Sequence, residues 1–138
     1  MKLFTLFFLG SFSLLSFANA DAVSAPEDAK VYFISPADGD VIQGSVKVVM
    51  GLDGMGVAPA GVVKENTGHH HLIINAPTPE TGKPIVNDDN HRHFGGGQTE
   101  TEIQLPSGKH TLQLVLGDFA HRPHANPVVS EVITITVE

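Results

Sequence analysis

Short segments in which apolar and polar residues alternate recur along most of this chain, and they restrict its fold more than any other feature. Gly, Pro, Asn and Asp separate the segments, and no stretch longer than a few residues repeats its apolar positions with a helical period. A period of two is typical of strands with one buried face, whereas these four residue types favour turns. The sequence therefore predicts an all-β protein.

The expected strands cover residues 30–35, 45–50, 70–75, 101–105, 109–116 and 129–137. Ser107-Gly108 is expected to form the tight turn of a hairpin between the fourth and fifth strands. This spacing favours an antiparallel, immunoglobulin-like β-sandwich of about seven short strands with two long loops. A small barrel is the alternative. The period of two assigns to the core Val31, Phe33, Val46, Val48, Leu72, Ile74, Ile103, Leu105, Leu112, Leu114, Leu116, Ile133, Ile135 and Val137.

Residues 1–20 have the pattern of a secretory signal peptide. Lys2 precedes an apolar run from Leu3 to Phe17, and Ala18-Asn19-Ala20 forms a small-x-small cleavage site. The apolar run is shorter than the ~20 residues that span a bilayer. We expect cleavage after Ala20, a single β-sandwich domain over residues 21–138, no membrane insertion after cleavage, and a periplasmic or secreted location.

The charge balance of the chain is acidic, with 8 Lys and Arg residues against 15 Asp and Glu residues. Nucleic acids and anionic membrane surfaces require a basic footprint, so this balance argues against both as partners. The chain has no cysteine, which excludes disulfides, cysteine catalysis and thiolate ligands. Packing, together with any bound metal ion, must therefore stabilise the exported domain.

Seven of the eight histidines lie in three groups where the chain is expected to turn: His69, His70 and His71; His91 and His93; His121 and His124. In an antiparallel sandwich, the start of the third strand and the end of the fifth lie at the same end of the domain. The long connection after the third strand can return to that end, because three consecutive glycines at 95–97 let the backbone turn freely. The three groups are therefore expected to share one rim.

Residues two apart on an extended segment project to one face, so His69 with His71, and His91 with His93, can each bind one ion as a pair. We predict a metal site formed by His69, His71, His91, His93, His121 and His124. Imidazole donors without thiolates suit a copper or zinc ion and disfavour calcium and magnesium. The carboxylates expected to orient the imidazoles are Asp88, Asp89, Glu100 and Asp118. His70 is expected to face the core as a hydrogen-bonded residue, and His110 to be structural.

Several blocks of the sequence resemble an uncharacterised family of small exported bacterial domains. They are SPADGDVI, GLDGMGVAPAG, TGHHHLIIN, HFGGGQTE, LPSGKHTLQLVLGDFAHRPH and VVSEVITITV. The resemblance covers nearly all of the chain after residue 20. It implies a periplasmic β-domain but brings no established activity.

The favoured function is a periplasmic, histidine-rich transition-metal-binding protein that handles, buffers or delivers copper or zinc, with an unknown periplasmic protein as a further partner. One alternative is a metal-dependent enzyme, an oxidoreductase or hydrolase, that uses the same histidines. Serines are sparse near the histidines, so no catalytic nucleophile is predicted. The other alternative is a cell-envelope interaction module with structural histidines and no metal.

Overall fold

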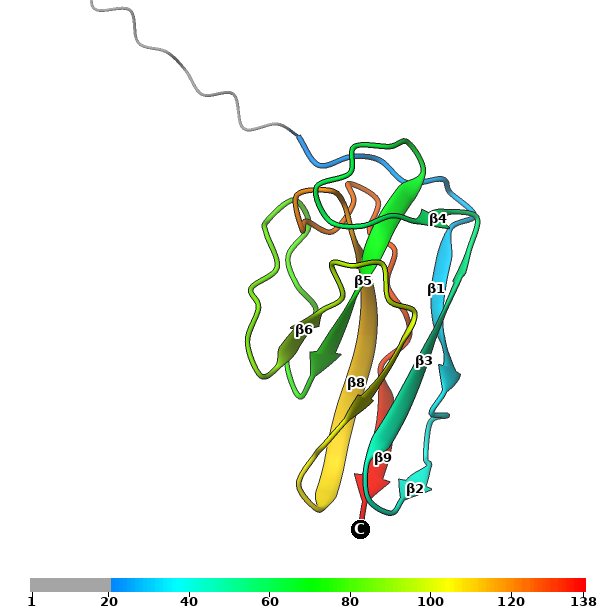
Figure 1. The fold of residues 1–138 in the computed structure, drawn as a ribbon, viewed down its shortest axis with the longest axis vertical. Helices are drawn as coiled ribbons and strands as arrows, with labels where there is room; N and C mark the ends of the chain where they lie inside the picture. The colour runs from blue at the N-terminus through cyan, green and yellow to red at the C-terminus, as the bar shows by residue number, and fades with distance from the viewer. Residues whose placement is uncertain (1–20) are drawn as a thin grey trace, which may run out of the picture.

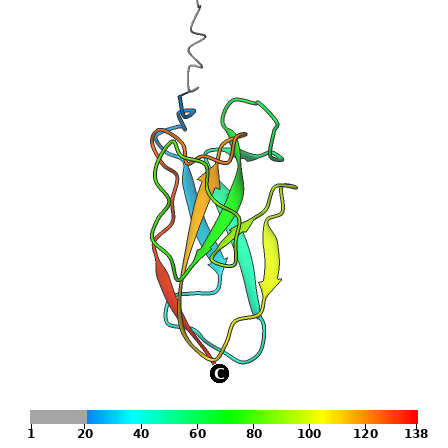
Figure 2. The same ribbon diagram turned by 90° about the vertical axis from the view of Figure 1, so that its left-hand side faces the viewer.

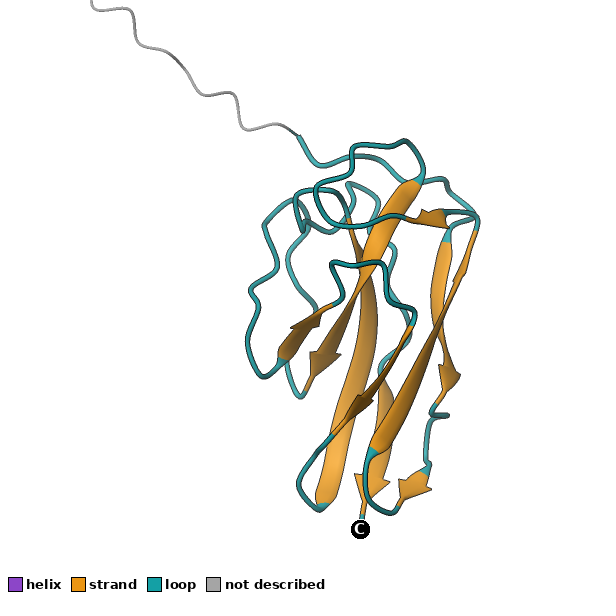
Figure 3. Cartoon of the chain, viewed as in Figure 1, coloured by secondary structure: helices purple, strands orange, loops and turns teal. Residues whose placement is uncertain are grey.

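Nine strands form between residues 21 and 138, the part of the protein that its computed structural model describes. They are β1 (Lys30–Ser35), β2 (Val41–Ile42), β3 (Val46–Asp53), β4 (Gly56–Val57), β5 (Thr67–Ile74), β6 (His91–His93), β7 (Glu100–Ile103), β8 (Gly108–Gly117) and β9 (Ile133–Val137). Within these residues the chain contains no helix (Figure 3), and hence none that could cross a membrane. The predicted signal peptide, residues 1–20, lies outside the described residues.

The strands form two sheets, which confirms the predicted β-sandwich (Figures 1 and 2). The smaller sheet has the order β1-β3-β7, and the larger has the order β2-β9-β8-β5-β4, with β6 also paired to β5. Most pairs are antiparallel, whereas β2 with β9 and β4 with β5 are parallel. Because β5 lies between β8 on one side and β4 and β6 on the other, it organises the end of the larger sheet that carries the histidines.

The core between the sheets consists mainly of the residues that the alternating pattern assigns to it. Phe33, Ile103 and Leu105 are partly buried and pack against this core. The remaining predicted residues are buried: Val31, Val46, Val48, Leu72, Ile74, Leu112, Leu114, Leu116, Ile133, Ile135 and Val137. Full burial of each aliphatic side chain contributes about 1.5–3 kcal/mol, so this cluster is the main source of stability.

The predicted hairpin at Ser107-Gly108 is wrong. Strand β7 pairs with β3, whereas β8 pairs with β5 and β9, so the connection between β7 and β8 crosses from one sheet to the other. Alternation identifies the buried face of a strand but does not identify its neighbour, which is why the sequence could not exclude this crossover. A second difference is that residues 91–93, expected in a loop, form strand β6.

The face of β5 that points away from the core carries the histidines of interest. His70, Leu72 and Ile74 alternate with His69, His71 and Ile73, and the two sets lie on opposite faces. Leu72 and Ile74 belong to the main core, whereas Ile73 packs in a separate cluster with Ile85 and Val115. His69 and His71 therefore project from the outer face of the larger sheet, beneath the loops that cover it.

Candidate metal centre

Four histidines converge on the outer face of the larger sheet, and we call them the four-histidine centre: His69, His71, His93 and His121. One ring nitrogen from each lies within 4.8 Å of those of the other three. The Nε2 atoms of His69 and His71 are 3.0 Å apart, and Nε2 of His69 is 3.3 Å from Nδ1 of His121. Four nitrogens bound to one ion in a tetrahedron with bonds of 2.0–2.1 Å would be about 3.3 Å apart, which is close to these separations.

Strand register brings three of the four rings together. The pairing of β5 with β6 places His71 opposite His93, and the pairing of β5 with β8 places His69 opposite Gly117. The start of β5 and the end of β8 consequently lie at the same end of the sandwich, as predicted (Figure 1). Directly opposite residues in an antiparallel pair have adjacent side chains, so the register itself places His93 beside His71.

His121 reaches the centre from the turn that follows β8. The backbone N–H of Asp118 donates to Arg122 O at 2.8 Å, and that of His121 donates to Asp118 O at 2.9 Å. His121 has a φ of 62°, in the left-handed region that residues other than glycine rarely adopt. Since such a conformation persists only where the surroundings impose it, the tight turn holds the His121 ring in place.

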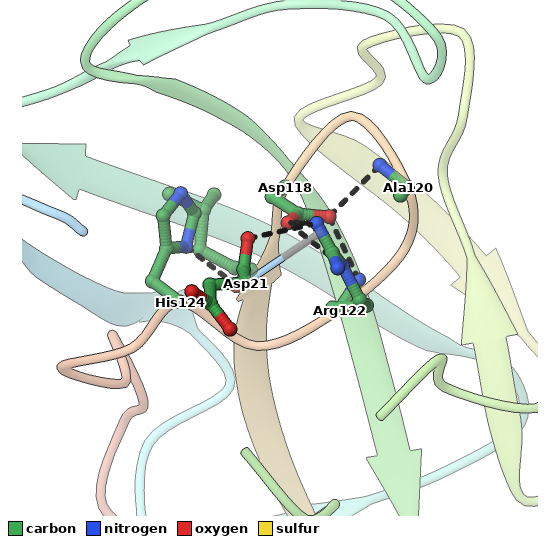
Figure 4. A network of polar contacts seen from close by, with 6 residues as sticks. Asp21, Asp118, Ala120, Arg122 and His124 are labelled. Atoms are coloured by element: carbon green, nitrogen blue, oxygen red, sulfur yellow. Dashed lines mark hydrogen bonds and ion pairs between the residues drawn. The ribbon is translucent and has the colours of Figure 1, made fainter. Parts of the chain in front are cut away.

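The carboxylate of Asp118 forms the core of this turn (Figure 4). It accepts hydrogen bonds from the backbone N–H groups of Ala120 and Arg122, at 2.8 and 3.0 Å. It also accepts two from the Arg122 guanidinium, at 3.1 and 2.9 Å. Burial alone would raise the pKa of Asp118, but the hydrogen bonds and charge of Arg122 lower it overall. Asp118 thus stays ionised and shapes the loop that carries His121.

Two glycines leave the space that the imidazoles fill. A Cβ atom on Gly117 would lie 2.8 Å from His71 Nε2, and one on Gly95 would lie 2.3 Å from His93 Cε1. Both distances are too short for a side chain to occupy without displacing a ring. Gly117 is the residue opposite His69. Because it has no side chain, this end of β8 leaves room for the rings of the centre.

A loop between β4 and β5 connects the two segments that supply His93 and His121. The backbone N–H of Ala60 donates to Gly95 O, and that of Gly61 donates to Phe119 O, both at 2.9 Å. This loop rises from the end of the sandwich at which residue 21 enters (Figures 1 and 2). The sequence marks the connection only as unusually long, and nothing in it identifies these two bonds.

Three rings of the centre, those of His69, His71 and His93, are held in their neutral form. His69 and His71 are buried, and desolvation, reinforced by the neighbouring histidines, lowers the pKa of His69 to about 4 and that of His71 to about 3. Burial and the proximity of His121 also lower the pKa of His93. A neutral imidazole keeps a lone pair for a metal ion, so the centre can bind a cation at neutral pH without first losing protons.

Hydrogen bonding between the rings accounts for only part of the arrangement. A neutral imidazole has one donor and one acceptor, yet Nε2 of His69 faces nitrogens of both His71 and His121. Nε2 of His93 is buried with no hydrogen-bond partner. A bound cation would accept every lone pair that points inward, which pairwise hydrogen bonds cannot do.

Two of the six predicted ligands, His91 and His124, lie outside the four-histidine centre. Nδ1 of His91 is 2.8 Å from a carboxylate oxygen of Asp88 near the surface. His124 is buried, with Nδ1 3.3 Å from Leu116 O. His91 is two residues from His93 on the same face of β6, but it pairs with Ile73 instead of a histidine.

The carboxylates expected to orient imidazoles have other partners. Asp118 binds Arg122, Glu100 lies near Lys47, and Asp89 lies near Arg92. Asp88 does bind a histidine, but that histidine is His91. The predicted orienting role is therefore not observed at the four-histidine centre.

The remaining two histidines have the positions expected of structural residues. His70 faces the interior, as predicted, where burial lowers its pKa and hydrogen bonds with the backbone of Gln98 and Gly51 partly offset that effect. His110 lies near Asn75 Nδ2, at 2.9 Å, and Pro106 O, at 2.7 Å.

A family described as a domain of unknown function, DUF4399, matches residues 48–138. The match includes all four histidines of the centre and agrees with the predicted membership of an uncharacterised domain family. No curated protein and no solved structure matches the chain.

Proposed function

The chain belongs to the DUF4399 family, and because the description of that family assigns no activity, we propose from geometry that the protein binds a transition-metal ion through His69, His71, His93 and His121. The convergence of four imidazoles, with ring nitrogens within 4.8 Å of one another, is the observation that supports this proposal. Copper and zinc are the ions that such a donor set suits. Handling, buffering or delivery of one of these ions is the corresponding function.

Export is part of the same proposal. The signal-peptide pattern of residues 1–20 supports a protein that acts in the periplasm or outside the cell. Expression of residues 1–138, followed by fractionation and determination of the N-terminal residue, tests this part. We expect Asp21 as the first residue of a protein in the exported fraction, and an intact Met1 in the cytoplasm would contradict it.

Binding is favoured over catalysis. A catalytic site for zinc keeps three protein ligands and an open position in a cleft, whereas a closed site has four protein ligands. The centre offers four donors, two of them from fully buried rings. A surface cleft beside it is lined by Arg92, His93 and Glu102, among others, but it includes none of the other three rings. A metal-dependent enzyme is therefore the weaker alternative.

Titration of the purified protein with Zn(II) and with Cu(II), followed by calorimetry and elemental analysis, tests the proposal. We expect one ion per chain and loss of binding in the double variant His69→Ala/His71→Ala. His91→Ala provides the matched control, because His91 lies two residues from His93 but outside the centre. Affinity no tighter than millimolar, or affinity unchanged in the double variant, would contradict the proposal and favour an interaction module with structural histidines.

A further inference from the structure

The spatial arrangement of the four rings carries information about which ion fits between them. Five of the six distances between ring centroids lie between 4.6 and 5.1 Å. The sixth, between His71 and His121, is 6.1 Å. A regular tetrahedron has six equal distances between its corners, and this set is close to that condition.

A square-planar arrangement would give a different set of distances. The two diagonals of a square share no corner, and both are about 1.4 times as long as the sides. If the 6.1 Å distance were one diagonal, the other would join His69 and His93. That pair is 5.0 Å apart, within the 4.6–5.1 Å range of the four distances that would be the sides. The four rings therefore surround a volume and do not lie at the corners of a plane.

We propose that the centre selects a tetrahedral d10 ion, Zn(II), and disfavours Cu(II), an inference that rests on the metal-binding function proposed above. Zn(II) has no geometric preference from its d electrons and is usually tetrahedral, whereas Cu(II) prefers square-planar or tetragonal nitrogen donors. At a flexible site the common affinity order places Cu(II) above Zn(II). Selectivity for Zn(II) consequently depends on whether the protein can resist flattening of the four donors.

The backbone around the centre opposes such flattening. The register of β5 with β6 fixes His93 beside His71, and Gly95 lies directly against the His93 ring. His121 is held in a left-handed conformation by a turn whose carboxylate is buried with Arg122. A planar arrangement would require the distance between the His69 and His93 rings to increase, a displacement opposed by the strand register and by the close approach of Gly95 to the His93 ring. The cost of that displacement falls on Cu(II) and not on Zn(II).

Cobalt(II) reports the coordination geometry directly, because its visible bands are intense in a tetrahedral site and weak in an octahedral one. We expect one equivalent of Co(II) to give intense bands that one equivalent of Zn(II) abolishes, in the wild-type protein and in His91→Ala alike. Weak bands, or the intermediate intensity of a fifth ligand, would overturn the inference although metal binding stands. Absence of any bound Co(II), Zn(II) or Cu(II) would instead overturn the proposed function itself.

Competition between ions gives a second, independent measurement. The ratio of Cu(II) to Zn(II) affinity is compared between the folded protein and the same protein in urea, where the donors are free to rearrange. We expect folding to lower this ratio by at least about tenfold. A ratio that is unchanged or higher on folding, or a Cu(II) electron paramagnetic resonance spectrum typical of a tetragonal site, would overturn the inference.

Discussion

Gly117 affects the centre through the side chain that it lacks. A Cβ atom there would lie 2.8 Å from His71 Nε2, the atom nearest to His69 in the centre. The strand backbone at this position has an ordinary φ, so alanine would introduce no backbone strain and would act only on the ring. Overpacking of this kind costs typically about 1–3 kcal/mol.

We expect Gly117→Ala to weaken Zn(II) binding at least about tenfold while the β-sandwich still folds. Zinc calorimetry and far-ultraviolet circular dichroism of the same sample check this. Gly56→Ala is the matched control, because a Cβ atom on Gly56 would make an ordinary contact of 3.5 Å with Thr67 Cγ2. Equal zinc affinity in the two variants would show that Gly117 does not set the position of His71.

The low pKa values of the buried rings predict how the stability of the metal-free protein depends on pH. Above pH 6.5, His69 and His71 are neutral in both the folded and the unfolded states, so they do not affect the balance. Below pH 6.5 the unfolded chain gains protons that the folded protein does not accept until about pH 4 for His69 and about pH 3 for His71. Stability is therefore fully present above pH 6.5 and is lost as the pH falls through this window.

Urea unfolding of the metal-free protein at pH 7 and at pH 4.5 measures this effect. Each pH unit between the two pKa values corresponds to about 1.4 kcal/mol for each ring, so we expect a loss of a few kcal/mol. His71→Leu should reduce the loss, because it removes the ring with the lower pKa. Equal pH dependence in the two proteins would mean that the buried rings do not cause it.

At the scale of an element, the turn after β8 supports the centre through one buried ion pair. The side chains of Asp118 and Arg122 are 2% and 10% exposed, and their charged atoms are 2.9 Å apart. Asp118→Asn retains an oxygen that can accept the backbone bonds of the turn but removes the negative charge beside the guanidinium. Loss of one partner from a buried pair costs about 3–5 kcal/mol.

We expect Asp118→Asn to lower the free energy of unfolding by that amount and to weaken Zn(II) binding, because His121 depends on this turn. Chemical unfolding and zinc calorimetry measure the two effects. Glu80→Gln is the control, since the ion pair of Glu80 with Lys83 is exposed and such pairs contribute at most about 1 kcal/mol. Normal zinc affinity in Asp118→Asn would show that the turn holds His121 without the charge.

The alternating pattern was sufficient to predict two of the strands that build the centre, β5 and β8, but not the third, β6. The period of two located β5 and β8, and chain direction alone placed His69 near the residues that follow β8. Strand β6 was missed because three residues, His91–His93, are too short to show alternation. His91 and His93 consequently looked equivalent in the sequence, and only the pairing of His93 with His71 distinguishes them.

The role of Asp118 could not be predicted from the sequence either. A carboxylate close to histidines is a reasonable candidate to orient an imidazole, and Asp118 is three residues from His121. The structure instead directs its oxygens to Arg122 and to the backbone of the turn. Since the side chain of Arg122 must fold back over the turn to reach Asp118, this competition for the carboxylate is a tertiary effect that spacing cannot reveal.

At the scale of the whole molecule, the four-histidine centre joins parts of the chain that are distant in sequence. His69 and His121 are 52 residues apart in the sequence. His69 lies on β5, whereas His121 lies in the turn after β8, the strand that pairs with β5. In the absence of disulfides, an ion bound here would cross-link β5, β6 and the turn after β8. An ion that binds only the folded state stabilises it by about 2.7 kcal/mol at 100 times its Kd.

We therefore expect a strong chelator to lower the melting temperature of the zinc-loaded protein by roughly 10 °C, given the usual change of several degrees per kcal/mol for a domain of this size. Calorimetric melting with zinc, and with zinc plus chelator, measures the shift. The shift should persist in His91→Ala and disappear in His69→Ala/His71→Ala.

Hydrogen exchange should locate the effect, because the ion connects outer segments and leaves the core between the sheets unchanged. Protection gained only in the core, with none in β6 or residues 118–122, would mean that the ion binds elsewhere.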